Sequence, residues 1–144
     1  MKAALTAVLF LMLPALAAAE QQRSQLRVAA LVRPHIALLA VGEPAGLNVS
    51  EQDLQRGYVD AQARYIVSTN DRDGFRVRFA PRVGLAAKIL ISGLGGRIVV
   101  GDLEVDVLQA ANTEVLDLAF RFKLEPGLAA GTYPWPVSVT ATVD

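Results

Sequence analysis

A glycine-rich run, Gly93-Leu94-Gly95-Gly96, follows an apolar segment as a phosphate-binding loop would. A dinucleotide-binding loop needs a further glycine where Ile98 stands, and a helix must follow so that its N-terminus meets the phosphate. The residues from Arg97 to Val100 favour a strand instead. The run therefore predicts a hairpin turn.

Oxygen-bearing side chains alternate at Thr69, Asp71 and Asp73 before Gly74, as in half of a calcium-binding loop. The bidentate glutamate of an EF-hand would stand where Ala80 does, so an EF-hand is excluded. A lone calcium loop remains an alternative, but the turn chemistry of Asn, Asp and Gly explains the same residues without a metal. We predict no metal and no cofactor.

Residues for nucleophilic or acid–base catalysis are scarce. The chain has no cysteine and a single histidine, His35, which suits a strand end, and no serine lies in a Gly-x-Ser-x-Gly elbow. Asp102, Glu104 and Asp106 share a strand face and could pair carboxylates for glycoside cleavage, but that chemistry needs a cleft that a small sandwich rarely has. We predict that the protein is not an enzyme.

The clearest period-two alternation runs from Val115 to Val143, on both sides of the turn from Glu125 to Gly131. Each half buries one face, so we predict an antiparallel closing hairpin. The buried faces are Leu116, Leu118, Phe120, Phe122 and Leu124 in the first strand, and Tyr133, Trp135, Val137, Val139, Ala141 and Val143 in the second.

Pro134 and Pro136 lie two residues apart and lack a backbone N–H, so their missing donors should fall on one side of the last strand. We therefore predict an edge strand whose free side these prolines blunt, paired to its hairpin partner through Tyr133, Trp135 and Val137. General protection against aggregation is the simplest role for them.

The rest of the chain also favours short strands. A first strand is expected from Leu26 to Val41 with a break at Pro34, and a second hairpin from Tyr58 to Phe79 around the turn at 70–74. Further strands are expected at 86–92, 97–100 and 103–107, with one short helical turn capped by Ser50. These are about seven or eight strands, which predict an all-β, immunoglobulin-like antiparallel sandwich, with an up-and-down barrel as the alternative.

Aromatic side chains should hold the two layers together. The predicted aromatic core consists of Tyr65, Phe75, Phe79, Phe120, Phe122, Tyr133 and Trp135.

The N-terminus has the layout of a secretory signal peptide: Lys2, an apolar run to Leu13, and Ala17-Ala18-Ala19. We expect cleavage between Ala19 and Glu20, which leaves one domain over residues 20–144; an uncleaved anchor is the alternative, although the apolar run is short for one. The protein is therefore expected in the periplasm or at the cell surface, without a transmembrane segment after cleavage. Asn48 begins a glycosylation triplet whose use depends on the host.

The overall charge is balanced, with 14 basic and 14 acidic residues, but its distribution is uneven. Basic residues gather between Arg64 and Arg97, and acidic residues between Ile98 and Phe120. We expect cross-strand ion pairs within the domain, with stacking between copies as the alternative. The balance and the lack of interleaved aromatic residues disfavour nucleic-acid binding.

Several segments resemble small exported bacterial β-sandwich proteins, including subunits of chaperone–usher and spore-coat-U-like fimbriae. The similar residues are Leu124-Glu125-Pro126-Gly127, Ala130-Gly131-Thr132-Tyr133, Val137-Ser138-Val139-Thr140, Tyr58-Val59, Val67-Ser68-Thr69-Asn70 and Gly74-Phe75. The cysteine pair common in fimbrial subunits is missing.

The resemblance implies a non-enzymatic structural or adhesion-type subunit of a surface fibre, joined to copies of itself or to other subunits by strand addition at an open edge. The candidate donor is the alternating segment Leu26, Val28, Ala30 and Val32, which is otherwise the first strand of its own sandwich. The alternative function is a free periplasmic binding module for a small molecule, sugar or ion.

Overall fold

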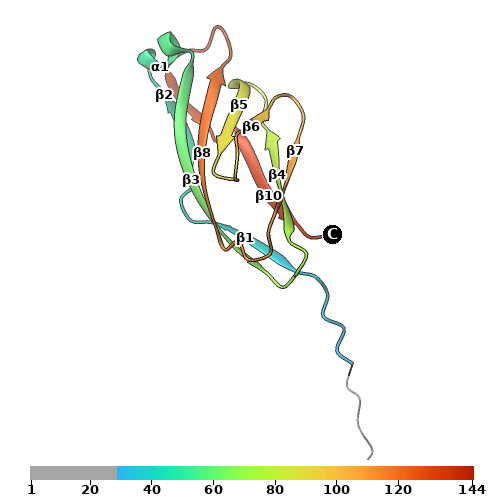
Figure 1. The fold of residues 1–144 in the computed structure, drawn as a ribbon. Helices are drawn as coiled ribbons and strands as arrows, with labels where there is room; N and C mark the ends of the chain where they lie inside the picture. Colours follow the sequence, from blue (N-terminus) through green and yellow to red (C-terminus); the bar gives the residue numbers. More distant parts are fainter. Residues whose placement is uncertain (1–28) are drawn as a thin grey trace, which may run out of the picture. The chain divides into compact units, whose positions relative to one another are not determined.

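A central strand, β8 (Val115–Leu124), organises the larger of the sheets in this computed structural model, which describes residues 29–144 (Figure 1). Residues 32–144 form one unit and are described by themselves. The strand buries Leu116, Leu118, Phe120 and Phe122, because these alternate with residues that face water. The antiparallel sheet has the order β1-β3-β8-β5-β6. Its other strands are β1 (Ile36–Ala40), β3 (Tyr58–Thr69), β5 (Ala86–Ser92) and β6 (Ile98–Val100).

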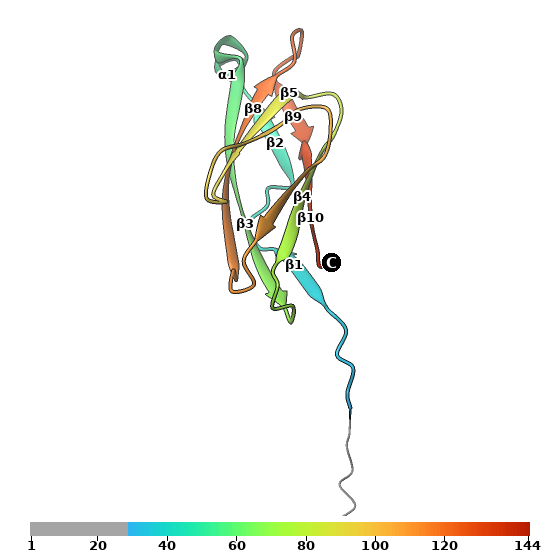
Figure 2. The same cartoon turned by 45° about the vertical axis from the view of Figure 1, so that its right-hand side comes forward.

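The second layer contains a three-stranded sheet, β10-β4-β7, and a two-stranded sheet, β2-β9, both antiparallel (Figure 2). Their strands are β2 (Gly46–Val49), β4 (Phe75–Pro81), β7 (Val105–Gln109), β9 (Gly131–Pro134) and β10 (Val137–Thr142). The residues between β9 and β10 are Trp135 and Pro136, so one stretch of chain serves both sheets in turn. The prediction of an all-β antiparallel sandwich is confirmed.

The predicted aromatic core lies between the layers. Tyr65, Phe75, Phe79, Phe120, Phe122 and Trp135 are buried, and Tyr133 is half-buried against them. The Trp135 ring meets Phe120 and Phe122 edge-on, with centroids 5.4 and 5.3 Å away. Such edge-to-face contacts are favourable beyond the area they bury.

Both long hairpins predicted from the sequence are wrong in their pairing, although their strands are correctly placed. β8 pairs with β3 and β5, whereas β9 pairs with β2 and β10 pairs with β4. Likewise β3 and β4 lie in different sheets. In each case the turn carries the chain across the core, so both strands still bury one face. Only the β5–β6 hairpin around the glycine-rich run is paired as predicted.

The first strand begins later than predicted, at Ile36 rather than Leu26. Ala30 and Val32 belong to no strand, and Leu26 and Val28 lie outside the described residues, as does the predicted signal peptide. The expectation that this segment is a strand of its own sandwich is therefore not met for residues 29–32. Pro34 explains the late start, because it cannot donate to a ladder.

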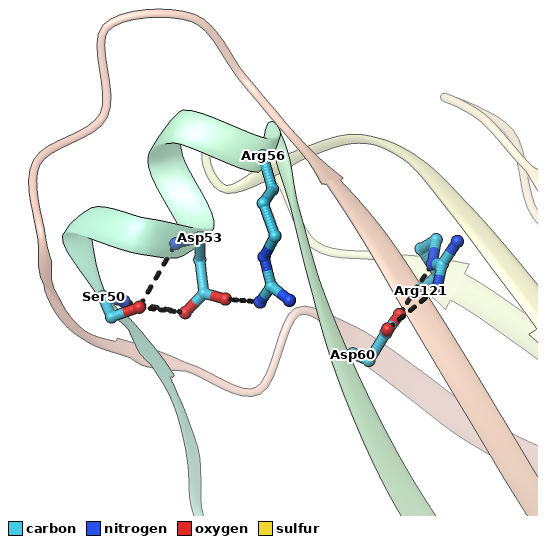
Figure 3. Close-up of polar contacts among 5 residues, drawn as sticks. All are labelled: Ser50, Asp53, Arg56, Asp60 and Arg121. Atoms are coloured by element: carbon cyan, nitrogen blue, oxygen red, sulfur yellow. Dashed lines mark hydrogen bonds and ion pairs between the residues drawn. The ribbon is translucent and has the colours of Figure 1, made fainter.

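The irregular region before β3 contains β2, which the sequence did not reveal, and the expected helical turn, α1 (Glu51–Arg56). Ser50 caps the helix: its hydroxyl accepts from Asp53 N, while the Asp53 carboxylate accepts from Ser50 N at 2.9 Å (Figure 3). This reciprocal box satisfies two helix-end donors. The Asp53 carboxylate also pairs with Arg56, and its bond from the Ser50 hydroxyl is the main cause that lowers the pKa of Asp53.

Cross-strand ion pairs account for much of the uneven charge, as expected. Arg78 of β4 pairs with Asp106 of β7 at 2.8 Å, and Arg64 of β3 pairs with Asp117 of β8. Arg76 of β4 pairs with Asp144, just beyond the end of β10. Within residues 29–144, no helix has the length and apolar character needed to cross a membrane.

Candidate functional site

The bare edge of β10 is the most distinctive feature of the second layer. β4 borders it on one side, and Arg82 N donates to Pro136 O at 2.8 Å just before β10 begins. Backbone groups alternate sides along an antiparallel strand, so this bond places the N–H and C=O groups of Val137, Val139 and Ala141 on the side away from β4. Their side chains face the core, and Val137 is fully buried. The edge therefore combines unpaired backbone with apolar side chains.

A second edge, β1, lies beside β10 near the C-terminal end of the chain (Figure 1). β1 belongs to the other sheet, where it pairs with β3, and no backbone hydrogen bond joins β1 to β10. Ile36 and Leu38 of β1 and Val139 and Ala141 of β10 are only partly buried. The two sheets thus meet at a seam along β10 that no backbone ladder closes.

The chain between β1 and β2 is bonded to β3 of the first sheet and not to β10. Val41 N and Gly42 N both donate to Arg64 O, at 2.9 and 3.2 Å. One residue further on, the Glu43 carboxylate accepts a hydrogen bond from the Tyr65 hydroxyl. Burial and then this carboxylate raise the pKa of Tyr65. The chain is therefore fastened where it leaves the first sheet, and it reaches the second sheet only at β2, beside β9.

The prolines do not lie as predicted. Pro136 stands in a bend and its carbonyl accepts from Arg82, so its backbone faces the bonded side. The prediction that it blunts the free side is wrong; the bend instead moves the chain from β2 to β4. Pro134 ends β9 opposite Gly46, and its protective role stays a prediction.

A clamp fixes the chain just before β1. Asn70, in the loop between β3 and β4, accepts from His35 N at 2.6 Å and donates from its side-chain amide to Arg33 O at 3.0 Å. Asn70 N and the Thr69 hydroxyl both donate to His35 O, at 3.2 and 2.9 Å. The sequence pointed to His35 as a strand end, and the structure adds that its backbone is held in this way.

The segment of the candidate donor ends at this clamp. Val32 is 71% exposed and precedes Arg33 directly. The donor segment therefore ends four residues before β1, the strand that lies beside β10. Leu26 and Val28 lie outside the described residues. No pairing of this segment is described.

The other candidate motifs form turns. Gly93 to Gly96 join β5 to β6, and Asp71 accepts from Asp73 N at 2.9 Å within the β3–β4 loop. Among residues 29–144, no three acidic, histidine or cysteine side chains gather as a metal site would require. Asn48 is exposed on β2.

The candidate site is therefore defined by three features: the free edge of β10, the neighbouring β1 in the other sheet, and the clamp at Arg33 and His35. Comparison of the chain with models of known protein families, with curated proteins and with solved structures finds no match.

Proposed function

We propose that the protein is an exported, non-enzymatic structural subunit that joins copies of itself by strand addition. The segment Leu26 to Val32 of one copy pairs with the free edge of β10 in the next. The observation that carries the proposal is this edge, where Val139 and Ala141 present unpaired backbone beside partly buried side chains.

The donor and acceptor match in length and pattern. Seven residues from Leu26 to Val32 extend over about 23 Å and the six of β10 over about 20 Å, at roughly 3.3 Å a residue. Every second residue of the donor is apolar and would lie on the same face of a strand: Leu26, Val28, Ala30 and Val32. These side chains would enter the seam beside Val139 and Ala141, so the same addition satisfies the backbone and covers the core.

The clamp fixes the backbone directly after the donor segment. Because Asn70 holds Arg33 and His35, β1 can stay in its own sheet while the segment before Arg33 pairs with the next copy.

The proposal is tested by size-exclusion chromatography with light scattering on the chain from Glu20, with and without residues 20–32. We expect oligomers that the deletion converts into folded monomers, because residues 32–144 form a unit by themselves. A monomer in both cases, or a deletion that unfolds the sheets, would refute strand exchange and favour a self-contained binding module.

Two point variants and one matched control locate the contact. Val28→Asp puts a charge on the face that enters the seam, and Leu31→Asp puts the same charge on the opposite face of the donor, as a matched control. Ala141→Pro removes a donor N–H on the free side of β10, where the β4 ladder does not use it. We expect Val28→Asp and Ala141→Pro to abolish oligomers and Leu31→Asp to leave them; equal effects of the two aspartates would contradict the proposed register.

A further inference from the structure

A trench lined by both polar and apolar side chains crosses the outer face of the five-stranded sheet, away from the seam. Its floor is the cross-strand row Gln62, Ala119 and Ser92, which the register places side by side on β3, β8 and β5. Two adjoining hollows of about 540 and 480 Å³ share Gln62 and Ala119 as lining residues. The trench exists because β8 carries alanine at 119, between the long side chains of the neighbouring rows.

Ion pairs lying across the strands form the two walls. On one side Arg121 binds Asp60 through two bonds of 2.7 and 2.9 Å (Figure 3). The guanidinium carbon of Arg121 also lies 4.1 Å from the centroid of the Tyr58 ring. On the other side Arg64 pairs with Asp117. Residues 117 and 121 are four apart on β8, so the walls stand about 13 Å from each other. Each wall is held by the strands below it.

One end of the trench carries an additional positive charge. Arg97, after the β5–β6 turn, lines the larger hollow and forms no ion pair within the part of the chain that the structure describes. The turn is packed directly on β8, since a Cβ at Gly93 would lie 2.1 Å from Asp117 O. The five charged residues Asp60, Arg64, Arg97, Asp117 and Arg121 sum to +1, three positive and two negative.

We propose that this trench binds an acidic polysaccharide, a chain of sugar residues carrying carboxylate or sulfate groups. The Gln62 amide and the Ser92 hydroxyl make no hydrogen bond within residues 29–144, so they are available to sugar hydroxyls, which both donate and accept. Arg97 supplies the contact to the acidic group. A lipid chain would need a continuous apolar floor, which Gln62 and Ser92 interrupt here, and an added peptide strand needs a sheet edge rather than a face.

The inference does not depend on strand exchange, and its test uses variants outside the seam. Binding of a galacturonic acid hexamer, a sulfated dextran oligomer and neutral maltohexaose is measured by isothermal titration calorimetry on the chain from Glu20. Ala119→Trp fills the trench and Arg97→Ala removes its free charge. Thr132→Trp, at an exposed position of β9, and Arg82→Ala, an exposed arginine without an ion pair among the described residues, are the matched controls.

We expect one or both acidic oligomers to bind and maltohexaose to bind at least about tenfold more weakly, with the more tightly bound acid identifying the anionic group. Ala119→Trp should weaken binding about tenfold or more and Arg97→Ala about fivefold, while both controls bind as the parent chain does. No binding of either acid, equal binding of maltohexaose, or losses of the same size in the controls would overturn the proposal. Salt-dependent binding that Ala119→Trp leaves unchanged would also overturn it, because it would place the contact elsewhere.

Discussion

Gly93→Ala should lower the free energy of unfolding for two reasons that can be separated, an unfavourable backbone conformation and a steric clash with β8. Gly93 has φ +115°, and an added Cβ would lie 2.1 Å from the carbonyl oxygen of Asp117. Gly84 has nearly the same φ, +114°, but nothing lies within 4 Å of a Cβ built there. Alanine would therefore suffer the same backbone strain at both positions, but only at Gly93 would its Cβ clash with β8.

The expected magnitudes follow from this difference. A side chain in such a backbone conformation costs about 1–3 kcal/mol, and this should be the whole effect of Gly84→Ala. Gly93→Ala must also move the turn or β8 by more than 1 Å, since 2.1 Å is far inside van der Waals contact. Such overpacking costs about 1–3 kcal/mol more. We expect a total of about 2–6 kcal/mol for Gly93→Ala.

The measurement is equilibrium unfolding in urea, followed by the fluorescence of the single tryptophan, Trp135, which lies buried between the layers. Linear extrapolation gives the free energy of unfolding for the parent and both variants. If Gly93→Ala and Gly84→Ala lower that free energy equally, within about 0.5 kcal/mol, the turn is not packed on β8 as described.

Three further predictions concern the core, the helix cap and acid stability. Phe120→Ala should lower the free energy of unfolding by about 3–5 kcal/mol in the same titration, and a loss near 1 kcal/mol would mean that the aromatic cluster is not close-packed. Ser50→Ala should cost about 1 kcal/mol, seen as a lower melting temperature, and an unchanged value would contradict the capping box. The hydrogen bonds from Arg121 hold the pKa of Asp60 below its ordinary 3.8, so its contribution to stability is present above that pH and is lost as the pH falls below it. Stability of Asp60→Asn should therefore fall less than that of the parent between about pH 5 and pH 2, and parallel curves would refute the pairing.

Much of the local structure could be predicted from residue patterns. Alternation in 58–68 and 115–124 correctly identified which side chains enter the core, and the Ser50 and Asp53 pair identified the helix cap. Strand pairing could not be predicted in this way, because a period of two says which face is buried and not which neighbour lies alongside. The turns at 70–74 and 125–130 are compatible both with hairpins and with crossings between layers, and the structure has crossings.

The candidate sites were visible only in part. The alternating apolar residues before Pro34 signalled a segment able to pair, but the free edge of β10 depends on β1 lying in the other sheet, which no local pattern reveals. The bond between Glu43 and Tyr65 joins a loop to a strand and was missed for the same reason. For the trench a signal existed: Ala119 is a small residue between Asp117 and Arg121 on the outward face.

The pairing of β8 with β3 also governs how the chain must fold. Val59 meets Phe122, and Phe79 meets Val139, so the ladders that complete each sheet join segments some sixty residues apart. Topologies of such high contact order fold slowly, over about milliseconds to seconds, because loop closure must precede most favourable contacts. A nascent chain that stops before Val115 contains neither β8 nor β10, so neither layer can be completed until both strands have been synthesised.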